Sequence, residues 1–296
     1  MPASYSGDNI GRATSGAAKG FLARAYLYNK DYTRCLATCN TISGYQFFTD
    51  WSQIFNEDND NGPQALFQLQ FTSGGIGEGS SLQNSLRDFG AKIVNGRTLQ
   101  FNGSSVVPLV SNDFINSFEA GDSRFDLSVA LTNEQISGSI QAWPMVWKFT
   151  AGAYDPTNQA DWGLNYTLMR YTEILLMKAE CINELNGPTA EAINIINMIR
   201  SRADLPDLTS AETADRSSFF KALVRERRHE FFYEGHRWLD LVRWGIAQEV
   251  INTFLDVELP TEPTARMSEK HKLFPIPSQQ IEIIGDESVL WQNPGW

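Results

Sequence analysis

The fold is decided by two stretches of similar texture, LARAYLYNKDYTRCLATCNTI (residues 22–42) and LMKAECINELNGPTAEAINIINMI (residues 176–199). Each has apolar residues at helical spacing, then a short turn and a second helix rich in Ala, Ile or Leu. Alanine between larger apolar residues lets two helices approach closely, as in tetratricopeptide-type repeats. The sequence therefore predicts a mainly α fold in which tetratricopeptide-like helix pairs form a scaffold.

Around these stretches, the 296 residues divide into four segments of one predicted domain, 1–296. The segments are a helical hairpin (12–43), a loop-rich insert with short strands (45–165), a helical bundle (166–254) and an extended, proline-rich tail (255–296). Within the bundle, periodicity and stop signals predict helices over 167–185, 189–203, 215–234 and 236–244. In the insert, alternation predicts strands over 65–71 and 143–149, and residues 111–129 predict a helix followed by a turn.

The composition excludes several classes of partner. The chain has 24 Lys and Arg against 35 Asp and Glu, a net charge of −11. So acidic a chain is a poor partner for nucleic acid or for an anionic membrane surface. No apolar run reaches the roughly 18–20 residues that span a bilayer. The opening MPASYSGDNI lacks the basic and apolar regions of a signal peptide, so none is expected in this sequence.

Residue types that bind metals are sparse. Cys35, Cys39 and Cys181 form no CxxC pair, and we interpret them as small buried apolar residues. His229 and His236 are seven residues apart, whereas a helical zinc site needs two His four apart. Neither a metal site nor a catalytic site is predicted from these residues.

One acidic turn leaves a calcium site as an open alternative. NEDNDNG (56–62) places Glu57, Asp58 and Asp60 close together, and oxygen ligands at alternate positions suit Ca²⁺. The glycine is one place out of the EF-hand register and the distal Glu is missing. A solvated turn is the favoured interpretation, and no other cofactor is predicted.

The densest charged segment is VRERRHEFFYEGHRWLDLVRW (224–244). Arg227 and Glu234 fall on the apolar stripe of its helix, where a charge is costly unless it is paired. The charges alternate in sign and can satisfy one another, so a structural role is favoured over a catalytic Glu with an Arg clamp. That role is expected of Arg227, Glu230, Glu234, Arg237, Trp238 and Asp240.

Aromatic residues in the loops carry the functional indication. Flat rings stack on the apolar faces of sugars, and Tyr and Trp add a polar group. The predicted glycan-binding residues are Trp143, Trp147, Tyr154, Trp162 and Trp51. Binding would then depend on stacking and hydrogen bonds, with little role for charge and a weak dependence on salt. The alternative for each ring is that it caps the helical core beneath a long loop.

Six segments together resemble the C-terminal part of the SusD/RagB family. They are RATSGAAKGFLARAYLYNKDY (12–32), FEAGDSRF (118–125), YTLMRYTEILLMKAECINEL (166–185), INMIRSRADLP (196–206), VRERRHEFFYEGHRWLDLVRWG (224–245) and LFPIPSQQIEIIGDESVLWQNPGW (273–296). They follow the family's order along the whole chain. None of them contains the five predicted glycan-binding residues, which rest on composition alone.

The resemblance implies a non-enzymatic protein that captures oligo- or polysaccharide at the outer membrane of a Gram-negative bacterium. It implies delivery of the glycan to a SusC-like TonB-dependent transporter, and attachment as a surface-exposed or periplasm-facing lipoprotein. The family's signal peptide, lipid-anchor Cys and N-terminal portion have no counterpart before Met1, and that portion contributes to the family's glycan site.

Two other functions stay open. One is a helical-repeat scaffold that binds only protein. The other is a glycoside hydrolase, which needs two carboxylates about 5 Å or 6.5–9.5 Å apart. Its first candidates are Glu119, Asp122, Asp155 and Asp161.

Overall fold

The computed structural model describes the backbone of residues 1–85, 89–94, 97–102, 110–131, 133–135, 140–141, 144–149 and 161–296. Side chains are described for 1–83, 110–131, 144–149 and 161–296. The chain forms two compact units, Met1–Glu234 and Gly235–Trp296. The interpretation as one domain stays a prediction, and each unit is described by itself.

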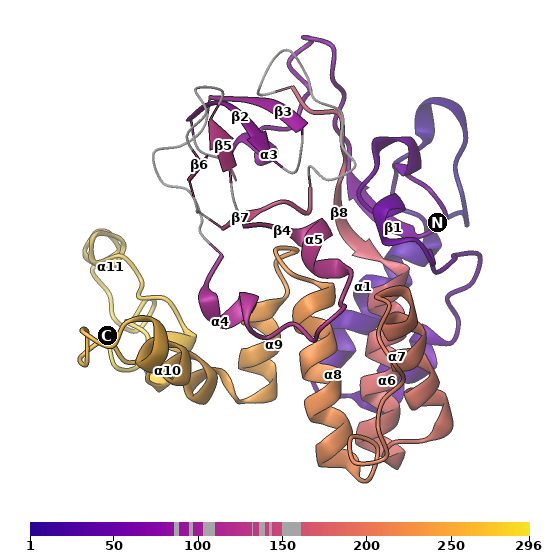
Figure 1. Ribbon diagram of the computed structural model, residues 1–296. Helices are drawn as coiled ribbons and strands as arrows, with labels where there is room; N and C mark the ends of the chain where they lie inside the picture. The colour runs from indigo at the N-terminus through magenta and orange to yellow at the C-terminus, as the bar shows by residue number, and fades with distance from the viewer. Residues whose placement is uncertain are drawn as a thin grey trace. The chain divides into compact units, whose positions relative to one another are not determined.

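The first unit is mostly helical. Its described helices are α1 (Ser15–Tyr28), α2 (Tyr32–Cys39), α3 (Leu82–Ser85), α4 (Asn112–Ile115), α5 (Arg124–Ser128), α6 (Tyr171–Asn186), α7 (Ala190–Arg202) and α8 (Arg216–Glu230). Short 3₁₀ turns lie at η1 (Gly7–Asn9), η2 (Trp51–Gln53) and η3 (Glu57–Asn59). The hairpin α1–α2 packs on α6, and α6 packs on α7 and α8, which lie side by side in Figure 1.

The long helices begin where the sequence supplies a cap. The side chains of Thr14, Asp31, Thr189 and Asp215 each accept a hydrogen bond from a backbone N–H of the first turn. Such caps satisfy donors that the helix itself leaves unpaired. The predicted mainly α fold and its helix pairs are confirmed.

Strands in the first unit are short. They are β1 (Ala65–Leu69), β2 (Phe89–Val94), β3 (Arg97–Asn102), β4 (Val129–Ala130), β5 (Asn133–Gln135), β6 (Ile140–Gln141), β7 (Met145–Val146) and β8 (Tyr166–Arg170). They form an antiparallel pair β1–β8, a sheet in the order β3-β2-β5-β6 and a pair β4–β7. The strand predicted over 65–71 is confirmed as β1.

The helix predicted over 167–185 begins only at Tyr171. The preceding residues form β8, which pairs with β1 from Ala65↔Arg170 to Leu69↔Tyr166. Helical periodicity continues through this segment, but the edge of β1 needs hydrogen-bond partners, and the pairing supplies them. The strand therefore leads directly into α6 (Figure 1).

Two of the apolar clusters among the described residues of the first unit bear on the site. One joins α1, α2 and α6 through residues such as Ala23, Leu27, Cys35, Met177 and Cys181. The three cysteines are free and buried there, as predicted. The other lies under the insert and includes Trp51, Phe55, Val146, Trp147, Phe149 and Trp162.

The second unit contains α9 (Arg237–Trp244), α10 (Ala247–Glu258), the 3₁₀ turn η4 (Glu269–Lys272) and α11 (Ser278–Ile284). Its cluster is small, with Leu241, Ala247 and Met267 at the centre. The tail predicted as extended therefore includes a helix, α11, because the run SQQIEII has apolar residues at helical spacing. Phe274 in this tail is 83% exposed.

No helix among the described residues is long and apolar enough to cross a bilayer.

Candidate functional site

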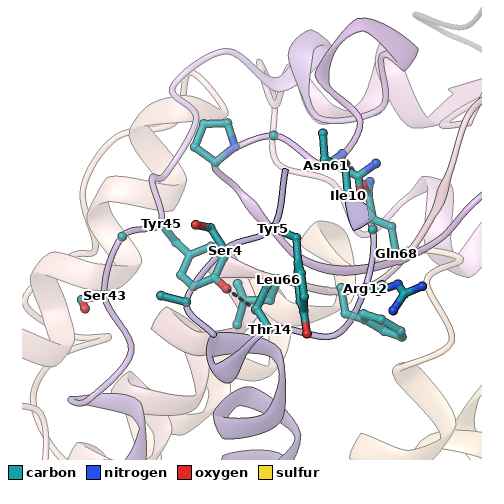
Figure 2. Close-up of a pocket in the computed structure, with 16 residues that line it drawn as sticks. Ser4, Tyr5, Ile10, Arg12, Thr14, Ser43, Tyr45, Asn61, Leu66 and Gln68 are labelled. Carbon is teal, nitrogen blue, oxygen red and sulfur yellow. Dashed lines mark hydrogen bonds between the residues drawn. The ribbon is translucent and has the colours of Figure 1, made fainter. Parts of the chain in front are cut away.

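A cavity of about 450 Å³ lies in the first unit, where the N-terminal segment meets the turn after α2 and the start of β1 (Figure 2). Its lining comes from residues 3–5, 10–12, 14, 43–45, 61–63 and 66–68. Concave sites of this size, apolar with a few placed polar groups, are typical of small-molecule binding. We therefore take this cavity as the candidate site.

One wall is the ring of Tyr45. Its hydroxyl forms a hydrogen bond with Thr14 Oγ1 at 3.0 Å, and its ring stacks on Tyr171 with centroids 6.3 Å apart. The ring lies against Gly16 of α1, so closely that a Cβ at Gly16 would be 2.5 Å from Tyr45 Cε2. The turn before it uses Gly44 with φ +86°, a conformation that other residues rarely adopt. The chain thus fixes this ring in place.

A second ring faces the cavity from the N-terminal segment. Tyr5 is half-buried, and Figure 2 shows it on the other side of Leu66 from Tyr45. The two rings flank an apolar floor. This arrangement suits a ligand with apolar faces and polar edges.

The polar side of the cavity is ordered by hydrogen bonds. The Asn61 backbone N–H donates to Gln68 Oε1 at 2.6 Å, and Gln68 Nε2 donates to Thr167 Oγ1 at 2.9 Å and to Asp60 Oδ1 at 3.2 Å. The Asn165 backbone N–H donates to Asp60 Oδ2 at 2.8 Å. Burial raises the pKa of Asp60 to about 6, although these hydrogen bonds oppose the shift.

The cavity lining has no acid. None of its 16 residues is Asp or Glu, and its one Lys or Arg is Arg12. A glycoside hydrolase needs two carboxylates beside the bond that it cleaves. The cavity lining therefore lacks the pair of carboxylates that would catalyse hydrolysis.

Three of the predicted glycan-binding residues lie in the core. Trp51, Trp147 and Trp162 are 4%, 3% and 1% exposed and belong to the cluster under the insert. In this structure their rings offer no face to a sugar, and the core-capping alternative describes them. Trp143 and Tyr154 lie outside the described residues, and their role stays a prediction.

The sequence reasoning missed Tyr5 and Tyr45. Tyr5 is an isolated aromatic residue in a polar stretch, whereas Tyr45 is followed closely by Phe47 and Phe48. Their segments are separated by the whole of α1 and α2. A turn glycine directly before Tyr45 was the one local signal. Their proximity depends on how the hairpin folds back, which single-sequence patterns do not reveal.

The charged segment has the structural role expected of it. Glu226 pairs with Arg124 and Arg200, and Glu234 pairs with Lys148. Glu230 is enclosed by arginines, and in the second unit Asp240 pairs with Arg243 at 2.8 Å. Arg227 lies over the ring of Phe231, whereas Trp238 is 37% exposed. These carboxylates are held by the protein's own cations.

The carboxylates considered for hydrolysis are likewise engaged. Glu119 pairs with Arg200, and Asp122 pairs with Arg124, both at 2.7 Å. Asp161 Oδ2 accepts hydrogen bonds from the N–H groups of Gly74 and Gly75. Asp155 lies outside the described residues.

The acidic turn at 56–62 does not assemble a calcium site. Asp60 is used by Gln68 and Asn165, and the side chain of Asn56 caps η3. In the part of the chain that the structure describes, no cluster of three or more His, Cys, Asp or Glu is arranged to hold a metal ion.

Comparison with known proteins identifies the family. Residues 129–296 match the model of the SusD family. The chain belongs to the SusD family. A SusD-like protein of Formosa agariphila is 25% identical, in an alignment that covers 94% of this chain and 58% of the relative. A second one from that organism is 23% identical and covers 96% and 60%. The chain thus spans about three fifths of these SusD-like relatives.

Solved structures of the family have the same fold. Surface glycan-binding protein A from Bacteroides fluxus is 27% identical, with a TM-score of 0.77 over 100% of this chain and 66% of its own. A SusD superfamily protein from Parabacteroides distasonis is 23% identical, with a TM-score of 0.78 over 100% and 65%. The similarity to the Parabacteroides distasonis protein shows the fold alone.

Proposed function

We propose that this SusD-family protein binds oligo- or polysaccharide without altering it chemically. The observation that carries the proposal is the cavity, where Tyr5 and Tyr45 flank an apolar floor beside ordered amides and no carboxylate is present. Rings bind the apolar faces of a sugar and amides bind its hydroxyls. The Bacteroides fluxus relative is itself described as a surface glycan-binding protein, which supports the same class of ligand.

The proposal extends to the setting that the family implies. The glycan would be captured at the outer membrane by a lipid-anchored protein and delivered to a SusC-like TonB-dependent transporter. Family membership supports this part. Co-purification of the full-length lipoprotein with such a transporter tests it, and consistent failure to co-purify in detergent would contradict it.

Isothermal titration with a panel of oligosaccharides tests glycan binding. Tyr5→Ala should weaken the affinity at least about tenfold, because it removes one stacking surface. The thermal midpoint should stay nearly unchanged, because Tyr5 is only half-buried and lies outside the two apolar clusters described above.

Chromatography of the same mixtures tests the non-catalytic part. The oligosaccharide should be recovered intact after prolonged incubation. Release of reducing ends would contradict the proposal in favour of a hydrolase, and the absence of binding to any glycan would favour the protein-binding scaffold.

A further inference from the structure

Arg12 is the one Lys or Arg that lines the cavity. Its side chain is exposed, and among the described residues it forms no ion pair or side-chain hydrogen bond. Other arginines of the first unit behave differently, since Arg24, Arg124, Arg170, Arg200 and Arg202 each contact a carboxylate. Arg12 is therefore available to a ligand.

The side chains around Arg12 also favour an anionic ligand. The cavity lining contains no Asp or Glu, in a chain with 35 of them. Asp60, which precedes Asn61 of the lining, is engaged within the protein, because its two oxygens accept hydrogen bonds from Gln68 and Asn165. An anionic ligand would meet one positive charge and no facing carboxylate.

The chemistry of the guanidinium indicates which class of ligand Arg12 would bind. Its planar N–H donors match the two oxygens of a carboxylate, and such charge-assisted pairs are roughly twice as strong as neutral hydrogen bonds. The rings of Tyr5 and Tyr45 and the side chain of Asn61 line the same cavity and are placed for a sugar ring. The amide of Gln68 is held by hydrogen bonds within the protein. Figure 2 labels Arg12 among the residues that line this cavity.

We propose that the cavity binds a uronate-containing oligosaccharide, with the guanidinium of Arg12 paired to a sugar carboxylate. This inference rests on the proposed glycan binding and specifies its substrate class. It departs from the sequence-based expectation that charge plays little part, because the cavity combines an unpaired cation with an acid-free lining.

The test uses three acidic trisaccharides, of galacturonate, mannuronate and glucuronate. Each is paired with the neutral trisaccharide made by reducing its carboxylates to primary alcohols. Affinities come from isothermal titration at 50 mM NaCl. At least one acidic trisaccharide should bind about tenfold or more tightly than its neutral counterpart, and raising NaCl to 500 mM should weaken only the acidic one.

Variants at Arg12 test whether this residue causes the preference for the acidic trisaccharide. Arg12→Gln should abolish the preference by lowering the affinity for the acidic trisaccharide to that for its neutral counterpart. Arg12→Lys should retain part of the preference. The thermal midpoint should not move, because the Arg12 side chain is exposed and lies outside the two apolar clusters described above. Arg34→Gln is the matched control, since Arg34 is an exposed arginine that pairs with Asp31 on α2, away from the cavity lining.

The outcomes separate the two proposals. Equal binding of every acidic and neutral pair, or a preference that survives Arg12→Gln, overturns the uronate proposal and leaves glycan binding intact. Failure to bind any saccharide of either kind, together with failure of the wider glycan panel, overturns both.

Discussion

Glu230 is completely buried and yet surrounded by positive charge. Its Oε1 lies 2.6 Å from Arg170 Nη1 and 2.5 Å from Arg202 Nη2, and Arg124 Nη1 is 3.7 Å from Oε2. Burial by itself would raise the pKa of Glu230. The charges of Arg202, Arg170 and Arg124 outweigh that effect and lower the pKa to about 2. This carboxylate therefore neutralises guanidinium groups that α7, β8 and α5 bring into the interior.

Glu230→Gln should destabilise the protein by about 3–5 kcal/mol, because it leaves buried guanidinium groups without their counter-charge. Urea unfolding measures the loss. Glu191→Gln is the matched control: Glu191 is exposed on α7 and pairs with Lys178 at 3.3 Å, so its change should stay within about 0.5 kcal/mol. Equal effects of the two variants would contradict the structural role of the buried network.

The lowered pKa of Glu230 predicts how the free energy of unfolding depends on pH. The pKa of Glu230 is about 2 in the folded protein and near its ordinary 4.5 when unfolded. A carboxyl with a lowered folded pKa stabilises above the unfolded value and loses that contribution as pH falls through the folded value. About 3 kcal/mol should therefore disappear between pH 5 and pH 2.

Urea midpoints measured at pH 6, 4 and 3 check this prediction. Glu230→Gln removes the titrating group, so its stability should fall less steeply over that interval than that of the wild type. A variant that follows the wild-type slope would show that other carboxyls dominate acid unfolding.

At the scale of elements, local signals predicted the helices well. Caps such as Thr14 and Thr189 and apolar spacing are contained within one segment, so α1, α2, α7 and α8 followed from the sequence. Strand β8 did not, because Tyr166–Arg170 has helical periodicity and becomes a strand only through its partner β1. An element that depends on a partner about 100 residues away along the chain carries little local signal.

The contact between α1 and Tyr45 predicts an effect of element packing on binding. Gly16→Ala places a methyl group 2.5 Å from Tyr45 Cε2, so the ring must leave its position against Tyr171 and Thr14. Overpacking of this kind costs about 1–3 kcal/mol. The thermal midpoint should fall, and the affinity for the saccharide should fall with it.

A double-mutant cycle tests the cause. In a Tyr45→Ala background the methyl group has room, so Gly16→Ala should cost little stability, giving a coupling of about 1 kcal/mol or more. Ala18→Ser, an exposed change on the same helix, is the control and should be nearly silent. Additive effects of Gly16→Ala and Tyr45→Ala would contradict the contact.

At the scale of the whole molecule, sequence motifs predicted the family but not the candidate site. The charged segment 224–245 and the other five segments are contiguous runs, readable without a structure. The cavity is assembled from three separate stretches, and its rings are scattered tyrosines. Composition does not show which aromatic rings are buried, and Trp147 and Trp162 are buried.

The net charge of −11 and the single positive charge in the cavity act at different ranges. A uronate trisaccharide is repelled by the whole chain until it reaches Arg12. The Debye length is about 30 Å at 0.01 M salt and about 8 Å at 0.15 M, so salt removes the long-range repulsion first. Salt also screens the ion pair between Arg12 and the uronate carboxylate. The bound complex is therefore less stable.

Association and dissociation should therefore both become faster as NaCl rises from 0.01 to 0.15 M, the association rate by roughly two- to threefold. Stopped-flow fluorescence with a uronate trisaccharide measures both rates, and the reduced, neutral trisaccharide should show neither change. Arg12→Gln should keep the salt-accelerated association, because the net repulsion remains, and lose the salt dependence of dissociation. A wild-type association rate that falls with salt would contradict this prediction. It would mean that the local field of Arg12 outweighs the net charge of the molecule during association.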